Sequence, residues 1–131
     1  MKKIFIGIDF SKEKFDATVI KAEDLGEMQS IGHQEFINKA TGYRKMLCWV
    51  CSLCGADTCE DWLFCGENTG DYSKGLCSFL YGKGYDMWLE NAKSIKDASG
   101  LRRLKSDRAD ASMIAEYAMR NYDKAIMYEP L

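Results

Sequence analysis

Residues 3–10 read Lys-Ile-Phe-Ile-Gly-Ile-Asp-Phe, with apolar side chains at both alternating sets of positions. A strand that is apolar on both faces is typical of the centre of a sheet covered on both sides. Asp9 is the exception, and it falls on the same strand face as Phe5 and Gly7. An ionised carboxylate inside such a strand costs free energy unless something positive meets it. Asp9 is therefore the first candidate for a functional residue.

The residues that follow predict how the sheet is completed. Residues 15–20 return as a second strand after a turn at residues 11–14, and residues 31–37 supply a third, which makes an antiparallel meander. The later part of the chain alternates helix and strand, which favours parallel pairing through crossover connections. The elements expected there are a helix, a strand, a helix, a strand and a helix over residues 43–54, 62–67, 72–81, 86–90 and 107–121.

This order predicts an α/β fold. It has a five-stranded mixed sheet, in which a three-stranded antiparallel meander is followed by parallel strands, and helices cover both faces. The first, fourth and fifth strands are expected to be parallel neighbours. The chain has 131 residues, 47% hydrophobic and 29% charged, which suits a single domain over residues 1–131 with one substantial core.

Three further acids stand out by position. Glu67 ends the fourth strand, and the ends of the first and fourth strands lie side by side if the two are parallel neighbours. Asp107 and Asp110 are three residues apart and so share one face of the last helix. The same face continues as an apolar stripe through Ala111, Ile114, Ala115 and Ala118. This stripe should pack on the core and point both acids inward.

A helix packed across that edge would bring Asp9, Glu67, Asp107 and Asp110 to one point. Four carboxylates cannot all stay ionised in one place without cations. Hard oxygen donors suit Mg²⁺ or Mn²⁺, and two such ions about 4 Å apart can assist phosphodiester cleavage. The alternative is a helical first turn that is rich in Asp because the helix dipole favours acids there.

Charge is unevenly distributed along the chain. The net charge is −2, but residues 91–108 hold six basic and two acidic side chains, a net +4, which leaves −6 elsewhere. A basic segment on an acidic body indicates a local anion-binding surface, although a solvated loop would also fit. Its basic residues are Lys93, Lys96, Arg102, Arg103, Lys105 and Arg108.

No apolar run approaches the roughly 20 residues that a membrane span needs. Asp9 comes too early for a signal peptide, and no cleavage site of small residues follows it. A soluble cytoplasmic protein is expected.

The cysteines offer a competing metal site. Cys48, Cys51 and Cys54 with Cys59 have spacings similar to those of zinc or iron–sulfur ligands. Cys51 and Cys54, however, fall on the apolar stripe of the first helix, where they are expected to be small buried hydrophobic residues. The single histidine, His33, is expected to be structural or on the surface.

Three motifs in order resemble those of a known family. Residues 6–12, Ile-Gly-Ile-Asp-Phe-Ser-Lys, resemble the opening of the DEDD transposases of the insertion sequence 110 group, relatives of the pilin-gene invertases. Residues 66–70, Gly-Glu-Asn-Thr-Gly, resemble their second acidic motif, and residues 105–111 their third. Asn91-Ala92 stands where the family often has Asn-Pro. Phe10 and Ser106 depart from the usual Val and Thr without touching the acids.

The resemblance implies an RNase H-like fold of the RuvC type and a D-E-D-D metal site at Asp9, Glu67, Asp107 and Asp110. It also implies DNA recombination with Mg²⁺ or Mn²⁺, a structured guide RNA as a further partner, and a homo-oligomeric full-length protein in a bacterial or archaeal cytoplasm. Members of the family carry a C-terminal domain with a nucleophilic serine. This chain is therefore expected to be the N-terminal domain alone, incomplete for strand exchange.

Two other functions compete with that of an enzyme domain. The first is a nucleic-acid-binding module without activity of its own, which Mg²⁺-dependent cleavage by the isolated chain would exclude. The second is an actin-like phosphotransferase, whose fold also starts with an acid-bearing hairpin. That class needs a glycine-bearing phosphate turn, and residues 11–14, Ser-Lys-Glu-Lys, contain no glycine.

Overall fold

The computed structural model describes residues 2–23, 26–55, 59–99 and 107–130, and of Cys59, Ser99 and residues 107–109 the backbone alone. The helices and strands, in chain order, are β1 (Ile4–Phe10), β2 (Lys14–Ala22), β3 (Met28–Ile37), α1 (Ala40–Cys54), β4 (Trp62–Glu67), α2 (Asp71–Gly82), β5 (Met87–Glu90), α3 (Ala92–Ser99) and α4 (Asp107–Asn121). Among these residues, no helix is long and apolar enough to cross a membrane.

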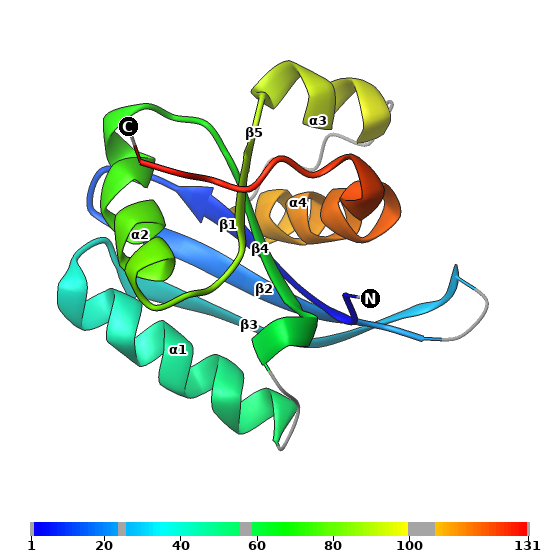
Figure 1. The fold of residues 1–131 in the computed structure, drawn as a ribbon, viewed down its shortest axis with the longest axis horizontal. Coiled ribbons are helices and arrows are strands. Elements are labelled where there is room, and N and C mark those ends of the chain that lie inside the picture. Colours follow the sequence, from blue (N-terminus) through cyan, green and yellow to red (C-terminus); the bar gives the residue numbers. More distant parts are fainter. Residues whose placement is uncertain (1, 24–25, 56–58, 100–106, 131) are drawn as a thin grey trace.

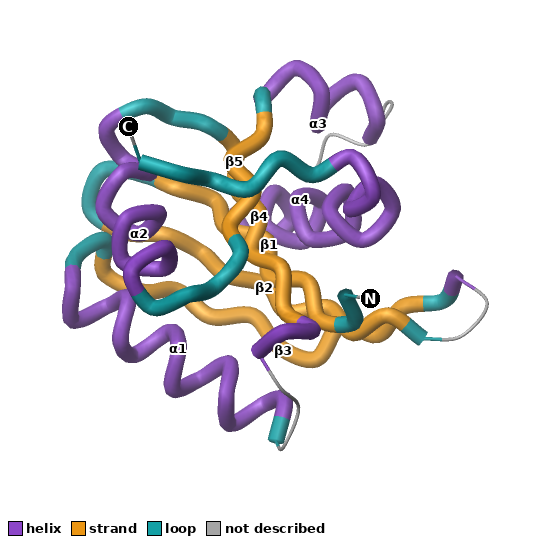
Figure 2. Tube along the Cα trace, viewed as in Figure 1, coloured by secondary structure: helices purple, strands orange, loops and turns teal. Residues whose placement is uncertain are grey.

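The five strands form one mixed sheet in the order β3-β2-β1-β4-β5 (Figures 1 and 2). β1 and β2 are antiparallel, as are β2 and β3, whereas β1, β4 and β5 run parallel to one another. The predicted meander followed by parallel strands is confirmed. β1 lies at the centre, as its two-sided apolar pattern indicated.

Helices cover both faces of the sheet, which confirms the three-layer prediction (Figure 1). Ile4, Ile6 and Ile8 of β1 belong to the buried cluster on the side of α1 and α2. Phe5 belongs to a second cluster, which contains Ile114 and Ala118 of α4. The alternation of side chains along β1 therefore supplies the core on both sides.

Helix α4 lies directly on the backbone of β1 at Gly7. A Cβ at this position would overlap the carbonyl oxygen of Ala111 and the nitrogen of Ala115, and would stand 2.9 Å from the Ala115 Cα. Only glycine permits so close an approach of helix to strand. The predicted stripe is confirmed as the buried face of α4: Ala111, Ile114, Ala115 and Ala118 are all at most 1% exposed.

The direction of α4 follows from two contacts. Gly7 lies under Ala111 and Ala115, while the ring of Phe5, earlier in β1, lies 5.7 Å from that of Tyr122, just after α4. The helix therefore runs antiparallel to β1, and its first turn lies toward the Asp9 end of that strand.

Helix α3 was not predicted. The sequence pattern indicated only a basic segment there, because Ile95 is its one large apolar side chain and is surrounded by charged residues. Ile95 is buried in the cluster on the α4 side of the sheet, and this contact holds the short helix in place. β3 also begins earlier than expected, at Met28. Residues 100–106 of the basic segment lie outside the described residues.

Candidate metal centre

Asp9 and Glu67 lie on neighbouring parallel strands at the same edge of the sheet. Ile8 pairs with Gly66 in the β1–β4 register, so the two acids follow that pair on adjacent strands. Both are partly exposed. They share the α4 side of the sheet with Gly7 and Cys65, which are themselves a register pair. Two acids from distant motifs are therefore brought to one place.

The backbone of α4 brings the other two predicted acids toward the same edge. Asp107 is the first residue of α4, and Asp110 precedes Ala111, whose carbonyl lies against Gly7. Asp110 is partly exposed. The side chain of Asp107 lies outside the described part of the structure. Among the described side chains, no group of three or more His, Cys, Asp or Glu is arranged closely enough to hold a metal ion.

Two acids that were not predicted from the sequence lie beside Asp9 and Glu67 on the neighbouring strands. Asp16 of β2 pairs directly with Asp9, and Glu90 of β5 pairs directly with Glu67. Asp16 is 5% exposed. Counting back through the turn at residues 11–14 could have placed Asp16 opposite Asp9. Nothing in the sequence gives the register of β5 against β4.

These two additional acids are already engaged by protein groups. His33 Nε2 lies 3.3 Å from an Asp16 oxygen, and Lys14 Nζ lies 3.9 Å from the other. The Tyr117 hydroxyl donates a 2.8 Å hydrogen bond to Glu90. Burial, and then this bond to Glu90, raises the pKa of Tyr117 to about 12, so it stays a donor. Asp16 and Glu90 therefore border the candidate site.

Asn38 joins the two chain segments that leave the acid-bearing strands. Its amide nitrogen donates to the carbonyl of Ser11, just after β1, and to that of Tyr72, in the first turn of α2, at 2.8 and 3.0 Å. The Tyr43 hydroxyl donates to the side-chain oxygen of Asn38, Oδ1, at 3.1 Å. The turns that follow Asp9 and Glu67 are thereby fixed to the start of α1.

The donors available at this edge fit a hard divalent cation. They are carboxylates, which suit Mg²⁺ and Mn²⁺ rather than a metal that prefers sulfur or imidazole. Two residues after Glu67, the buried hydroxyl of Thr69 has no hydrogen-bond partner among the described residues. A buried hydroxyl in this state favours a bound water or ligand nearby.

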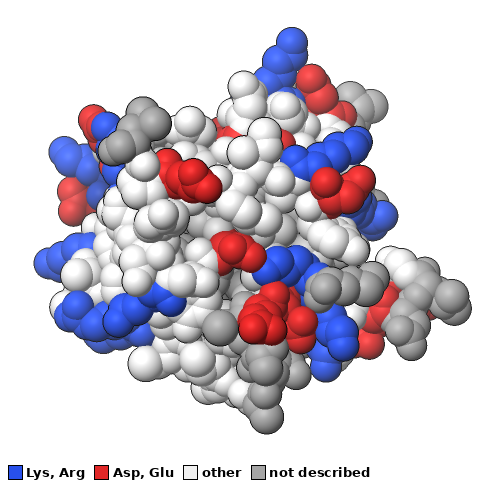
Figure 3. All heavy atoms as spheres, viewed as in Figure 1, with Lys and Arg blue, Asp and Glu red and all other residues white. Residues whose placement is uncertain are grey.

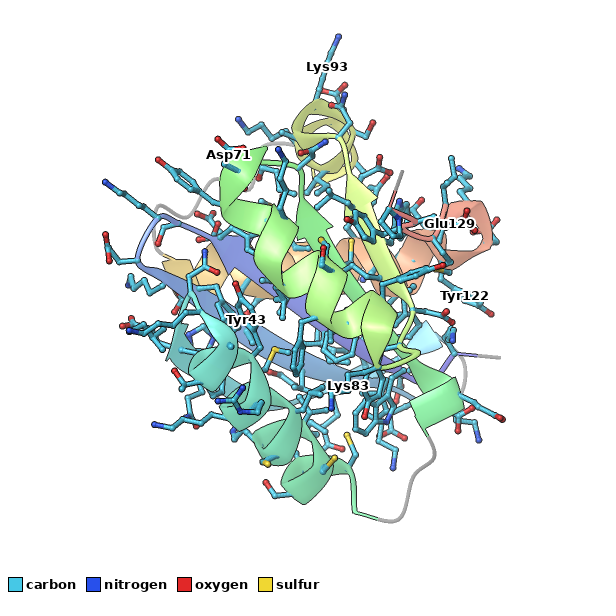
Figure 4. The ribbon with its side chains drawn as sticks, turned by 60° about the vertical axis from the view of Figure 1, so that its left-hand side comes forward. Tyr43, Asp71, Lys83, Lys93, Tyr122 and Glu129 are labelled. Carbon is cyan, nitrogen blue, oxygen red and sulfur yellow. The ribbon has the colours of Figure 1, made fainter. Side chains whose placement is uncertain are left out.

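Of the predicted nucleic-acid contacts, only Lys93 and Lys96 have described side chains. Both are exposed on α3, which follows directly from β5. Figure 4 shows Lys93 pointing away from the body of the molecule, and Figure 3 shows basic side chains at the top of the view, over α3. Arg102, Arg103 and Lys105 lie outside the described residues, as does the side chain of Arg108.

The comparisons with known proteins establish the family. The model of the DEDD transposases of insertion sequence 110, described as a transposase, matches residues 6–127. The chain therefore belongs to this transposase family. No curated protein sequence matches it.

Two solved structures of RuvC from Thermus thermophilus share the fold. The first, in complex with Holliday junction substrate, has a TM-score of 0.67 at 10% identity over 95% of this chain and 99% of its own. The second has a TM-score of 0.65 at 12% identity over 98% of this chain and 99% of its own. The RNase H-like, RuvC-type fold that the resemblance implied is confirmed.

His33 is structural in this fold, because it lies between Asp16 and Thr18 of the neighbouring strand.

The prediction that Cys51 is buried is wrong. Cys54 is buried as expected, but Cys51 is exposed, as is Cys48. Met46, Val50 and Cys54 form the face of α1 toward the sheet, and Cys51 lies on the outer side of the helix.

The thiols are expected to be reduced and free of metal. Burial raises the pKa of Cys77 to about 12 and that of Cys65 further, so both stay protonated and inert toward electrophiles. Alkylation of the native protein followed by peptide mass mapping should modify Cys48 and Cys51 within minutes, and Cys65 and Cys77 only after unfolding. Zinc or iron in stoichiometric amount on metal analysis would contradict this prediction.

Proposed function

We propose that this chain is the metal-dependent domain of a transposase that acts on DNA phosphodiesters. The observation that carries the proposal is the β1–β4 register, which sets Asp9 and Glu67 side by side under the end of the sheet where α4 begins. Asp9, Glu67, Asp107 and Asp110 would hold one or two Mg²⁺ or Mn²⁺ ions. The bound ions would supply an activated water and charge stabilisation at the leaving oxygen.

The protein's own residues prepare this edge for a cation and a phosphate. Asp107 is the first residue of α4, and the N-terminus of a helix favours negative groups. Tyr117 holds Glu90 by a hydrogen bond, and His33 and Lys14 lie close to Asp16. These contacts give both further carboxylates polar partners from the protein itself.

DNA is the proposed substrate, and the basic residues from Lys93 to Arg108 are proposed to contact its phosphates. The RuvC relative with the same fold was solved with a Holliday junction, which favours a branched or paired DNA partner here. A structured guide RNA, homo-oligomerisation of the full-length protein and action in the bacterial or archaeal cytoplasm complete the proposal, and all three rest on the family.

The second candidate is a nucleic-acid-binding module that needs another domain for chemistry. It is favoured by the fact that the described side chains do not form a ready-made set of three metal ligands. Ser11 and Ser73 donate hydrogen bonds to backbone carbonyls, and neither has the neighbouring base that a nucleophile needs.

In either case we expect no strand exchange by this chain. Incubation with Mg²⁺ and DNA carrying the element's ends should give neither joined products nor protein attached to DNA.

Metal is expected to stabilise the folded chain. A ligand that binds only the native state adds RT ln(1 + [L]/Kd), which is about 1–3 kcal/mol for metal at ten to a hundred times its Kd. Thermal melts with and without millimolar Mg²⁺ or Mn²⁺ should show this shift in the wild type and not in Asp9→Asn. The matched control is Asp123→Asn, an exposed acid just beyond the far end of α4, which should keep the full shift. Equal shifts in both variants would exclude the proposed ligand.

A further inference from the structure

A chain of polar side chains crosses the interface between the sheet and α4. His33 Nε2 lies 3.3 Å from Asp16 Oδ1, and His33 Nδ1 lies 2.8 Å from the Thr18 hydroxyl. The Thr18 hydroxyl in turn lies 3.3 Å from that of Ser112 on α4. This series of polar side chains therefore starts at Asp16, directly opposite Asp9, and ends at Ser112, two residues after Asp110.

Farther along α4, the Tyr117 hydroxyl is bonded to Glu90 of β5, but near the start of the helix the contact with the sheet is made by small residues. Around Gly7 the facing residues of α4 are Ala111 and Ala115, and the backbones touch there. Small side chains give a smooth contact, with few knobs to prevent the helix from sliding along the strand or rotating on it. A hydrogen bond is directional, so the pair Thr18–Ser112 restrains α4 where the apolar contact does not.

The polar groups of this series satisfy one another's hydrogen-bonding capacity. When the ring proton is on Nε2, the nitrogen that faces Asp16, and not on Nδ1, Nδ1 is an acceptor. The Thr18 hydroxyl then donates to Nδ1 and is left to accept from the Ser112 hydroxyl. Thr18 is fully buried, so loss of either partner would leave a buried polar group unpaired, which is unfavourable.

We propose that Asp16, His33 and Thr18 are positioning residues. Through Ser112 they fix the position of α4 on the sheet, and thereby the position of Asp110 relative to Asp9. None of them would touch metal or DNA. They would act as outer partners of the candidate ligands, a class whose loss lowers metal affinity by about 10- to 100-fold. The inference deepens the proposed function and rests on it where metal affinity is concerned.

The test replaces Thr18 in two ways. Thr18→Val keeps the shape and removes the hydroxyl, whereas Thr18→Ser keeps the hydroxyl and removes the methyl group. Val50→Ala is the control for stability, because Val50 is buried on α1, on the opposite face of the sheet. For each protein, Mn²⁺ affinity is measured by calorimetric titration, and amide hydrogen exchange over residues 111–115 is measured without metal.

Thr18→Val should raise the Mn²⁺ Kd about tenfold and speed exchange at residues 111–115, and Ser112→Ala should do the same. Thr18→Ser and Val50→Ala should stay near the wild-type affinity. An unchanged Kd and unchanged exchange in Thr18→Val, or equal changes in Val50→Ala, would overturn the positioning role. If the wild type bound no Mn²⁺, the proposed function would fail instead, and the exchange rates alone would decide the inference.

Discussion

Replacement of Gly7 by alanine is expected to lower the melting temperature by about 10 °C. The added methyl group would overlap the Ala111 carbonyl oxygen and the Ala115 nitrogen. Both are backbone atoms of α4, so no change of side-chain rotamer can make room, and the helix must move away from β1. Overpacking of this kind costs about 1–3 kcal/mol and more where backbone is displaced, which is a large part of the stability of a small domain.

Gly82→Ala is the matched control. Gly82 ends α2, and a Cβ there would meet nothing within 4 Å. Alanine favours a helix over glycine by up to about 1 kcal/mol, so the same chemical change should leave the melting temperature equal or slightly higher. Calorimetric melts of the three proteins would show the contrast. A Gly7→Ala protein as stable as the wild type would mean that α4 does not rest on β1 as described.

The same substitution links the fold to the proposed site. α4 carries Asp107 and Asp110, and Gly7 lies two residues before Asp9. A helix lifted from the strand would carry its acids away from Asp9 and Glu67. Gly7→Ala is therefore expected to lose metal stabilisation even at temperatures at which it remains folded.

The central part of the fold could be predicted because its signals are local. Residues 4–8 are apolar on both faces, which requires layers on both sides. The alternation of helix and strand after residue 40 requires crossovers and hence parallel strands. From these two facts the adjacency of Asp9 and Glu67 follows without any knowledge of side-chain packing.

The surroundings of the site could not be predicted, because they depend on register. A β-bulge between Val19 and Ile20 shifts the pairing of β2 with β3. Without the bulge, counting from the turn between these strands would place Gly32 opposite Thr18, and His33 would point to the other face. The series of polar contacts from Asp16 to Ser112 therefore depends on one β-bulge that no residue pattern in the sequence predicts.

DNA affinity is expected to depend steeply on salt. If the six basic residues between Lys93 and Arg108 each neutralise one phosphate of a duplex, the logarithm of the binding constant falls with that of salt concentration at a slope of about −5. Affinity would then drop about 10³-fold between 50 and 200 mM salt. The rest of the chain carries a net charge of −6 and repels DNA, so binding should be weak and confined to this segment.

Removal of two of these charges isolates the contribution of α3. The double substitution Lys93→Ala and Lys96→Ala should lower the magnitude of the slope by about 2, and weaken binding uniformly across DNA sequences, because phosphate contacts carry no sequence information. The charge-matched control is Lys83→Ala with Lys124→Ala, two exposed lysines outside the segment from Lys93 to Arg108; Figure 4 shows Lys83 far from Lys93. Fluorescence anisotropy at several salt concentrations measures both slopes. If the control lowered the slope as much as the α3 pair, DNA would be held by the net charge of the protein, and the segment from Lys93 to Arg108 would not be the binding surface.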